Sequence, residues 1–318
     1  MALGALFPGL ARVLDLALPF FGLIALGYAC GKIFDFGEGG LAFVNVFIVY
    51  IALPSLFFVL ISKTPLEKLS HPLFVLCTTA ATATAFAIAF GIGFYARRNV
   101  PEATIEAMIG AYSNIGYMGP GLTLAALGPQ AAGPTALIFL GDTVFLFAAL
   151  PLMMALGHRG NQGFGAIVWL IVKRIVTHPF NIAVAVAVLA AAFSLRPPQA
   201  IGRMIELLSG AAAPTALFAL GATMAMRPAR ALAPETPFLL GVKLIIHPMI
   251  AYAYLTLAGV DKLWVLTALL MASLPPALNV FVMASQYRVY VEQASGAILA
   301  GTLASVVTVT TLLWLIVG

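Results

Sequence analysis

Charged residues are scarce in this chain. Asp, Glu, Lys and Arg make up 8% of its 318 residues, whereas hydrophobic residues make up 62% and the mean hydropathy is +1.07. A soluble globular protein carries about 25% charged residues, so the composition indicates an all-α polytopic membrane protein. One helical span needs about 20 residues, so about ten spans fit and little remains for a soluble domain.

Cysteine and net charge are also low. Cys30 and Cys77 lie in or beside apolar stretches, which favours a role as apolar filler over a disulfide framework or a metal site. The net charge is +5 without a long basic run, so no nucleic-acid partner is expected. Lys and Arg instead concentrate at span ends, where they act as topology signals.

Enzyme motifs are missing as well. Gly141–Asp142 invites comparison with intramembrane aspartyl proteases, but position 139 is Phe where their Gly-x-Gly-Asp signature needs Gly. There is no obvious second intramembrane Asp at a matching site. No metal-ligand cluster, Gly-x-Ser-x-Gly elbow or phosphate-binding loop stands in a suitable context. The sequence therefore predicts no enzyme, no cofactor and no metal site.

Ten apolar stretches predict ten transmembrane spans. The first follows Arg12 and lacks a convincing cleavage site, so it is expected to be a retained span rather than a signal peptide. The predicted spans cover about residues 13–30, 41–61, 73–95, 105–128, 135–156, 167–193, 205–226, 238–257, 270–285 and 297–317.

The fourth and ninth spans cannot remain regular helices. Proline removes a backbone donor and clashes with the preceding turn, and glycine lowers the cost of leaving helical dihedrals. Backbone groups freed at membrane depth must be buried in protein or line a wet cavity. Two interrupted spans in corresponding halves of a chain indicate a transporter's substrate site. The residues concerned are Asn114, Gly116, Gly119, Pro120 and Gly121 in one span and Pro275, Pro276 and Asn279 in the other.

Proline spacing indicates an internal repeat. Pro19 and Pro179 are 160 residues apart, as are Pro54 and Pro214, and Pro120 precedes Pro276 by 156. A polar linker at 158–163 marks the midpoint. We therefore expect two five-span repeats, residues 1–160 and 161–318, and an odd number of spans makes the second repeat inverted.

Orientation follows from the basic residues of the loops. With the N-terminus outside, nine Lys and Arg residues lie on the cytoplasmic side and six on the other. The positive-inside rule then places both termini outside. The nine are Lys32, Arg97, Arg98, Arg159, Lys173, Arg174, Arg227, Arg230 and Arg288, and the six are Arg12, Lys63, Lys68, Arg196, Arg203 and Lys262.

Asn114 and Asn279 are the foremost candidates for substrate binding. Each lies at a proline or glycine break, where half-helix N-termini offer free N–H groups to a carboxylate. Both side chains could donate to a carboxylate or cap the freed backbone, and these roles need not exclude each other. The further candidates for the same site are Ser113, Tyr117, Pro120, Pro275, Pro276 and, within the second span, Tyr50; for Tyr117 the alternative is packing.

Ionisable residues inside a membrane are costly and indicate function by default. Asp142 lies in the middle of the fifth span, and Lys243 and His247 lie in the eighth. Asp142 could carry a proton, attract a cation or form a structural pair with Lys243 or His247. His178 and His247 precede prolines and favour structural roles, although titration near neutral pH leaves proton linkage open. Lys173 and Arg174 could snorkel to the headgroups.

Neither broken span has Asp or Glu at its break, which argues against sodium coupling. The strings SNIGYMGPGL at 113–122 and PPALNVFVMA at 275–284, with the ten-span inverted repeat, resemble the auxin efflux carrier family. That family includes plant PIN proteins and bacterial relatives labelled malonate transporters. The doubled Pro275–Pro276 departs from its pattern, and Asp142 has no placed counterpart.

The resemblance implies a fold similar to bile-acid and sodium/proton transporters. In that fold spans four and nine cross, and Asn114, Pro120, Pro276 and Asn279 would be the crossover residues. Spans one, two, six and seven would form a scaffold domain and the others a transport domain. The family also implies elevator-type alternating access, a homodimer and, for a bacterial member, the inner membrane.

Together these observations predict a secondary transporter for a small organic anion, of auxin- or malonate-like carboxylate type. The first alternative is a proton- or sodium-coupled symporter of organic acids or amino acids. Proteins of a different class, a channel or an intramembrane enzyme, would show unsaturable ion currents or a catalytic pair facing one cavity.

Overall fold

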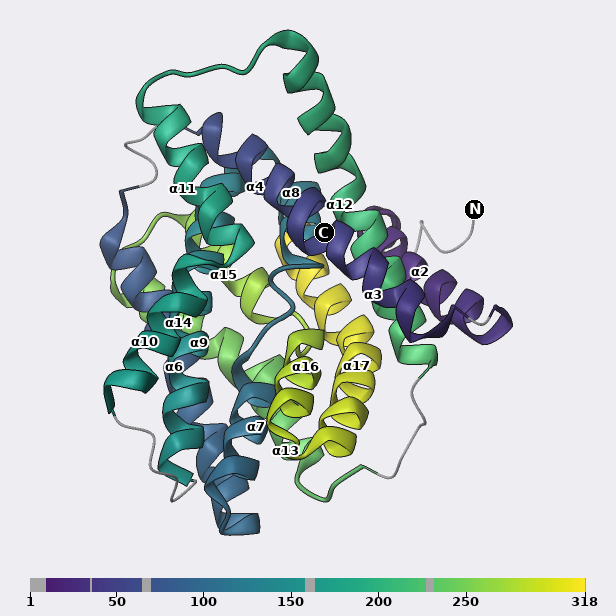
Figure 1. The fold of residues 1–318 in the computed structure, drawn as a ribbon, viewed down its shortest axis with the longest axis vertical. Helices are drawn as coiled ribbons and strands as arrows, with labels where there is room; N and C mark the ends of the chain where they lie inside the picture. Colours follow the sequence, from purple (N-terminus) through teal and green to yellow (C-terminus); the bar gives the residue numbers. More distant parts are fainter. Residues whose placement is uncertain (1–9, 35, 65–69, 158–163, 227–231, 318) are drawn as a thin grey trace.

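The computed structural model describes residues 10–34, 36–64, 70–157, 164–226 and 232–317, and within these ranges every regular element is a helix (Figure 1). The predicted midpoint linker, His158 to Gly163, lies outside the described residues, as do Lys68, Arg227 and Arg230 of the charge comparison. The all-helical expectation is confirmed for the part of the chain that the structure describes.

Seven segments of these ranges are helices long and apolar enough to cross a membrane. Four are single α-helices, one follows a 3₁₀ turn, and two contain a short π-helical turn. Their elements are α2 (Leu10–Ile33), α3–η1–α4 (Gly37–Phe47, Ile48–Ala52, Leu53–Ser62), α6 (Pro72–Arg97), α9 (Ala132–Gly157, after the 3₁₀ turn η2 at Pro129–Ala131), α12 (Gln199–Ala225), α13–η3–α14 (Thr236–Gly241, Val242–Ile246, His247–Leu257) and α17 (Val291–Val317).

The predicted sixth span is divided in two. α10 (Phe164–Val176) and α11 (Pro179–Ala192) meet at a bend of 57°, and together they would make an eighth span. Pro179 stands at the start of α11, and it forces His178 before it into the extended region (φ −68°, ψ 126°). The Asn181 side chain then donates to the freed Ile175 carbonyl at 2.8 Å. The bend brings the end of α10 toward the interior.

Both predicted interruptions are present. α7 (Val100–Ala111) and α8 (Gly119–Leu127) are separated by residues 112–118, and α15 (Lys262–Ala272) and α16 (Leu278–Tyr287) by residues 273–277. We call these segments the first loop and the second loop. The second helix of each pair begins directly after the loop, at Gly119 and at Leu278. Each pair of helices is therefore one apolar stretch with a non-helical centre.

Two π-helical turns precede prolines. η1 ends two residues before Pro54, and η3 ends two residues before Pro248. A proline inside a helix lacks an N–H and clashes with the carbonyl four residues earlier, and one extra residue in the turn relieves that conflict. The second of these turns contains Lys243, so the proline also sets how this cation projects from its helix.

Close helix packing depends on small residues. α2 packs along α12. A Cβ added at Gly221 would lie 1.9 Å from the Ile24 carbonyl oxygen, and a Cβ added at Gly27 would lie 2.1 Å from the Phe218 carbonyl oxygen. Figure 1 shows these two helices side by side. α4 packs on α11 and α12, whereas α6 packs on α7, α9 and α14. Small residues let backbones approach this closely in an apolar setting.

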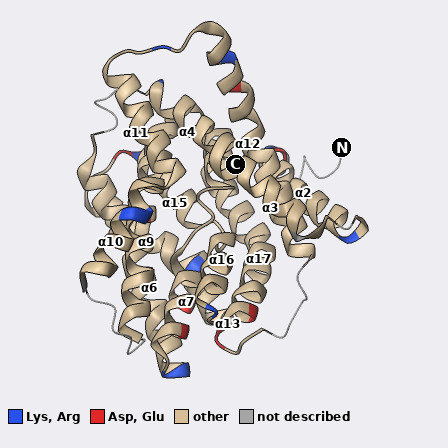
Figure 2. Ribbon diagram, viewed as in Figure 1, with Lys and Arg blue, Asp and Glu red and all other residues tan. Residues whose placement is uncertain are grey.

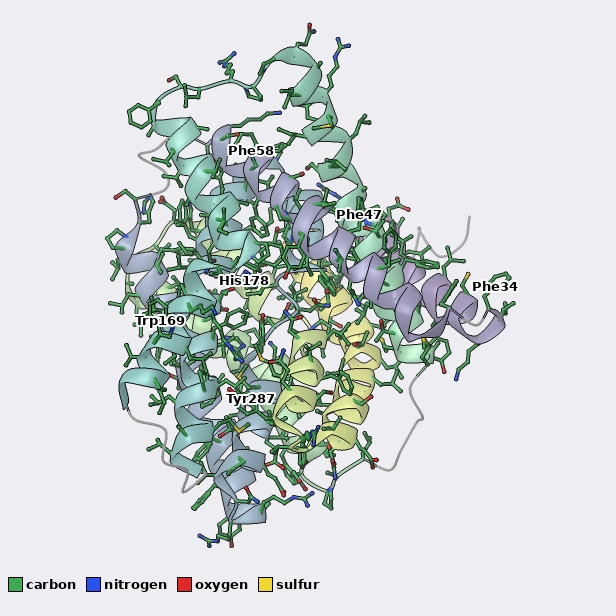
Figure 3. The ribbon with its side chains drawn as sticks, in the orientation of Figure 1. Phe34, Phe47, Phe58, Trp169, His178 and Tyr287 are labelled. Atoms are coloured by element: carbon green, nitrogen blue, oxygen red, sulfur yellow. The ribbon has the colours of Figure 1, made fainter. Side chains whose placement is uncertain are left out.

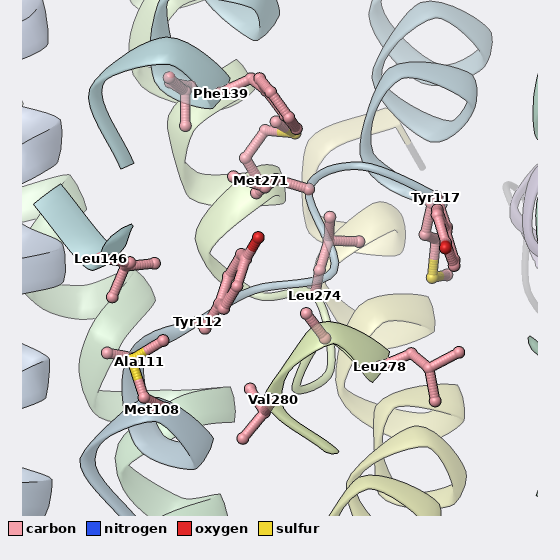
Figure 4. Close-up of a cluster of buried hydrophobic side chains, with 14 of the residues drawn as sticks. Met108, Ala111, Tyr112, Tyr117, Phe139, Leu146, Met271, Leu274, Leu278 and Val280 are labelled. Atoms are coloured by element: carbon pink, nitrogen blue, oxygen red, sulfur yellow. The ribbon is translucent and has the colours of Figure 1, made fainter. Parts of the chain in front are cut away.

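The charged residues lie mostly toward the ends of the helices (Figure 2). The interior is a continuous apolar cluster that surrounds the two loops, with Met108, Tyr112, Met271 and Leu274 among its members (Figure 4). Polar side chains are also buried in this interior, among them Asn114, Asp142 and Lys243.

Candidate functional site

The two loops bind each other through their backbones. The Asn114 N–H donates to the Pro275 carbonyl at 2.8 Å, and the Ala277 N–H donates to the Tyr112 carbonyl at 2.9 Å. These bonds form an isolated antiparallel bridge between Ser113 and Pro276. Backbone N–H and C=O groups that lose their helical partners at the breaks therefore bind each other across the two loops. Buried backbone groups need such hydrogen-bond partners. Figure 4 shows the non-helical chain at Tyr112 with Leu274 and Val280 close by.

A pocket of about 330 Å³ opens beside the paired loops. This volume lies at the small end of the range of ligand sites, which is roughly 300–1,000 Å³. Both loops, the start of α16, the bend between α10 and α11, two residues of η1 and one of α9 contribute to it. Its lining consists of Val49, Tyr50, Tyr112, Asn114, Gly116, Tyr117, Phe147, Arg174, His178, Phe180, Ala277, Leu278, Asn279, Val282, Met283 and Gln286.

Asn114 is the central polar residue of this pocket. Asn114 is 3% exposed, and its Oδ1 accepts from the Tyr117 N–H at 3.4 Å. The side chain therefore caps a backbone group of the first loop, which is one of the two roles expected from the sequence. Its Nδ2 is buried and has no hydrogen-bond partner among the described residues. A buried donor without a partner is costly, so a bound acceptor would remove the penalty.

The N-terminus of α16 faces the same pocket. Ala277, Leu278 and Asn279 form its first turn and all three line the cavity. The first N–H groups of a helix lack intrahelical partners and carry partial positive charge, which favours an anion. Asn279 donates from Nδ2 to the Tyr112 hydroxyl at 3.2 Å, so its amide is held at the mouth of this turn.

The structure separates the predicted substrate residues into two groups. Tyr50, Asn114, Tyr117 and Asn279 line the pocket, Tyr50 with 63% of its surface exposed. The other four are not among the lining residues and hold the loops instead: Ser113 and Pro276 form the bridge, the Pro275 carbonyl accepts from Asn114, and Pro120 lies in the first turn of α8.

Four polar lining residues escaped sequence reasoning: Tyr112, Arg174, His178 and Gln286. Tyr112 directly precedes the Ser-Asn pair of the first loop, and that position was the signal available. Arg174 was assigned to the headgroups and His178 to a structural role. Both reach the pocket because α10 bends into α11 at this point. Pro179 signals such a bend, but its direction depends on tertiary packing.

Asp142, Lys243 and His247 come together behind the second loop, as one buried network. The Lys243 ammonium donates to the Ala272 carbonyl at the end of α15 and lies 3.3 Å from His247 Nδ1. His247 Nε2 lies 3.3 Å from the Thr82 hydroxyl, which donates to Asp142 Oδ1 at 2.8 Å. We call these four residues the Asp142–Lys243 network.

The hydrogen-bond roles in this network follow from counting protons. Thr82 has one hydroxyl proton and gives it to Asp142, so His247 must donate from Nε2 and accept at Nδ1. Lys243 supplies the bond to Nδ1. Every bond therefore points the same way, from Lys243 through His247 and Thr82 to Asp142. The two charged residues are joined by two neutral groups.

A second buried cluster lies where α6 ends. Arg97 makes an ion pair with Glu235 (Nη2 to Oε1, 2.6 Å) and lies 3.8 Å from Glu106, and the Tyr290 hydroxyl donates to Glu235 at 2.7 Å. Burial opposes ionisation of Glu235, but the hydrogen bonds to its carboxylate, including those from Tyr290 and Arg97, outweigh burial and hold its pKa at about 2. We call these residues the Arg97 cluster; no sequence pattern predicted that they meet.

No group of three His, Cys, Asp or Glu side chains among the described residues is placed to hold a metal ion. The polar side chains of the pocket lining are amide, hydroxyl, imidazole and guanidinium groups. Donors outnumber acceptors around the pocket, and no Asp or Glu is among its described lining residues.

Comparison with known proteins gives consistent results. The family described as "Membrane transport protein" matches residues 13–162 and 164–315. A protein of Rhizobium meliloti (strain 1021) named "Putative malonate transporter" is 47% identical over 309 residues, which cover 96% of this chain and 97% of the relative. An "Uncharacterized transporter" of Methanothermobacter thermautotrophicus is 26% identical over 305 residues, 93% of this chain and 95% of the relative.

Proposed function

The chain belongs to the auxin efflux carrier family of membrane transport proteins, and from that premise we propose that it is a secondary transporter that binds a small organic carboxylate beside the paired loops. The observation that carries the proposal is the orphaned Asn114 Nδ2, which is buried in the lining of a 330 Å³ pocket that the N-terminus of α16 also faces. A carboxylate would accept from Asn114 and from the helix terminus together.

The substrate class has further support from the relative named for malonate transport. The apolar part of the lining, which includes Val49, Phe147 and Phe180, suits a short carbon skeleton. Tyr112 and Tyr117 add hydroxyl groups to the same lining. The site thus combines a few oriented donors with an apolar wall, which is the usual arrangement of a small-molecule site.

We further propose elevator-type movement of a transport domain against a scaffold. α12 packs on α2 and α4, α4 packs on α11, and α6 packs on α7, α9 and α14. This grouping supports a scaffold domain of spans one, two, six and seven and a transport domain of the other six spans. The eight apolar segments and the two broken pairs, α7–α8 and α15–α16, together give the ten spans of a five-plus-five inverted repeat. In this proposal the two broken pairs cross at the loops. A homodimer through the scaffold, a bacterial inner membrane and external termini complete the proposal.

Proton coupling is the second candidate, and the Asp142–Lys243 network favours it. Three of its hydrogen bonds run in one direction, from Lys243 to Asp142, and the Lys243 ammonium donates a fourth to the Ala272 carbonyl at the end of α15, directly before the second loop. Displacing the protons along this chain would neutralise Asp142 and Lys243 together. A change of charge next to the loop that bears the substrate site would link proton movement to substrate binding.

Replacement of Asn114 and of Asn279 by Ala tests the proposed function. Each variant removes an amide from the pocket, and a hydrogen bond to a charged group contributes about 1.5–3 kcal/mol, so the affinity for malonate should fall about tenfold or more. Binding to the purified protein is measured by calorimetry, and uptake by proteoliposomes. Ion currents that do not saturate with malonate would indicate a channel instead.

Asn99→Ala is the matched control. Asn99 is exposed and caps the N-terminus of α7 by accepting from the Glu102 N–H at 3.2 Å. Its loss removes the same side-chain amide and costs about 1 kcal/mol of helix stability, without touching the pocket. Malonate affinity that stays unchanged in both Asn114→Ala and Asn279→Ala would overturn the proposed site.

A further inference from the structure

Arg174 is a cation that faces the pocket from a wall other than the loops. We propose that Arg174 binds a second carboxylate and makes this site selective for dicarboxylates over monocarboxylates; the inference rests on the proposed function, since it assumes that the first carboxylate binds at Asn114 and α16. The site then has two anchoring points, one for each end of the substrate.

The position of Arg174 carries the argument. It lies in the last turn of α10, is half-buried and lines the pocket. Among the described residues no carboxylate forms an ion pair with it. A guanidinium next to apolar walls without a counterion is an unbalanced charge, and an incoming carboxylate restores the balance.

The neighbouring Lys173 shows that this is not a general property of the helix end. Lys173 is exposed and is not among the lining residues. It fits the expectation that cations at a span end extend to the lipid headgroups. Arg174, one residue later, faces a different direction and meets the pocket instead. The planar guanidinium fork also matches a carboxylate with two parallel hydrogen bonds, which an ammonium cannot do.

His178 adds a polar group at the same wall. Its ring lies against Phe147 and Phe180 with centroid distances of 5.0 Å each, and its buried Nδ1 has no partner among the described residues. Figure 3 places His178 toward the middle of the molecule and Trp169 of α10 at its periphery. The ring is therefore held in place by aromatic contacts, with a nitrogen available for one more hydrogen bond.

The lining supplies no competing charge. Arg174 is the charged side chain among the described lining residues, and neither Asp nor Glu occurs there. A monocarboxylate at the Asn114 end would leave Arg174 without an anion, whereas a short dicarboxylate reaches both. The small volume of the pocket favours a chain of few carbons between the two carboxylates.

The test compares malonate with its monomethyl ester, which has the same skeleton and one charge fewer. Arg174→Gln should lower malonate affinity about tenfold or more, since a charge-assisted bidentate pair is lost. The ester should lose less, so the ratio of the two affinities falls. Arg174→Lys keeps the charge without the fork and should retain part of the discrimination. Lys173→Gln removes a charge one residue away and should leave the ratio unchanged.

The outcomes separate this inference from the proposed function. If Asn114→Ala weakens both compounds and Arg174→Gln changes only their ratio, both proposals stand. If Asn114→Ala weakens both but Arg174→Gln leaves the ratio as in the wild type, the carboxylate site stands and the role of Arg174 is overturned, with lipid headgroups as its partner. If neither Asn114→Ala nor Asn279→Ala changes the affinity for either compound, the proposed function itself fails. Should Arg174→Gln not fold, the ratio measured for Arg174→Lys decides: a wild-type ratio overturns the inference.

Discussion

The two buried charged clusters of this protein are built in opposite ways. In the Arg97 cluster the charged groups touch: Arg97 lies against Glu235 at 2.6 Å, and Tyr290 adds a hydrogen bond to the same carboxylate. In the Asp142–Lys243 network the charges are connected through His247 and Thr82, both neutral in the bonding pattern that the distances require. The first cluster lies at helix ends, with Arg97 partly exposed, and the second lies in the interior behind the second loop.

This difference indicates different roles. Ion pairs of Arg97 join the end of α6 to α7 and to the start of α13, and the Tyr290 hydrogen bond adds the segment before α17. These contacts hold the elements together in one arrangement. A chain of neutral groups between two charges can change protonation without leaving a buried donor bare, because each group keeps a partner on both sides. The network is therefore suited to a change of state, and the Arg97 cluster to preserving one.

Replacing Lys243 should have the largest effect. Lys243 is fully buried, and Lys243→Met leaves Ala272 without its donor and Asp142 without a cation connected to it. Removing one partner of a buried charged pair costs about 3–5 kcal/mol, so the free energy of unfolding in detergent should fall by that order and uptake should cease. Lys262→Met, at the exposed start of α15, is the control. Equal stability of the two variants would show that Lys243 contributes nothing to the second loop.

Asp142→Asn should act mainly on pH dependence. Asn still accepts from Thr82 through its Oδ1, so the loss of stability should be about 1 kcal/mol. The charge at the end of the chain no longer changes, so uptake in proteoliposomes should lose its dependence on pH if the network carries protons. The double variant Asp142→Asn/Lys243→Met should be less destabilised than the sum of the single ones. A pH profile of uptake identical to wild type would leave Asp142 with a structural role.

The sequence predicted those features that depend on local chemistry. The breaks at the two loops follow from the prolines, glycines and asparagines of each segment, and their positions agree with the structure. Lys243 and Asp142 stood out because charges inside apolar spans are rare. The partner of Lys243, the Ala272 carbonyl, could not be predicted from the sequence. This carbonyl lacks an intrahelical partner only because α15 ends at Ala272, and its position beside Lys243 depends on how the helices pack. The place of Arg174 in the pocket and the contacts of Arg97 with Glu106 and Glu235 likewise depend on how distant helices pack.

The Arg97 cluster should respond to pH in a predictable direction. The pKa of Glu235 is lowered to about 2 in the folded protein, so its contribution to stability is complete above its ordinary pKa and is lost as the pH falls toward 2. Glu235→Gln should therefore be less stable than wild type by about 2 kcal/mol at pH 7, and the difference should narrow at pH 3. Thermal unfolding at both pH values measures it. A difference independent of pH would show that the charge of Glu235 is not what stabilises the cluster.

The exposed ion pair between Lys63 and Glu206 gives the smallest expected effect and sets the lower limit of the comparison. Its atoms are 3.0 Å apart, close to the distance in the Arg97 cluster, but the two side chains are 65% and 57% exposed. Exposed pairs contribute about 0–1 kcal/mol, because water screens the charges and the side chains lose freedom. Glu206→Gln should therefore change unfolding by less than about 1 kcal/mol, and the change should vanish at high salt. A loss as large as that of Glu235→Gln would mean that contact distance, rather than burial, decides what an ion pair contributes in this protein.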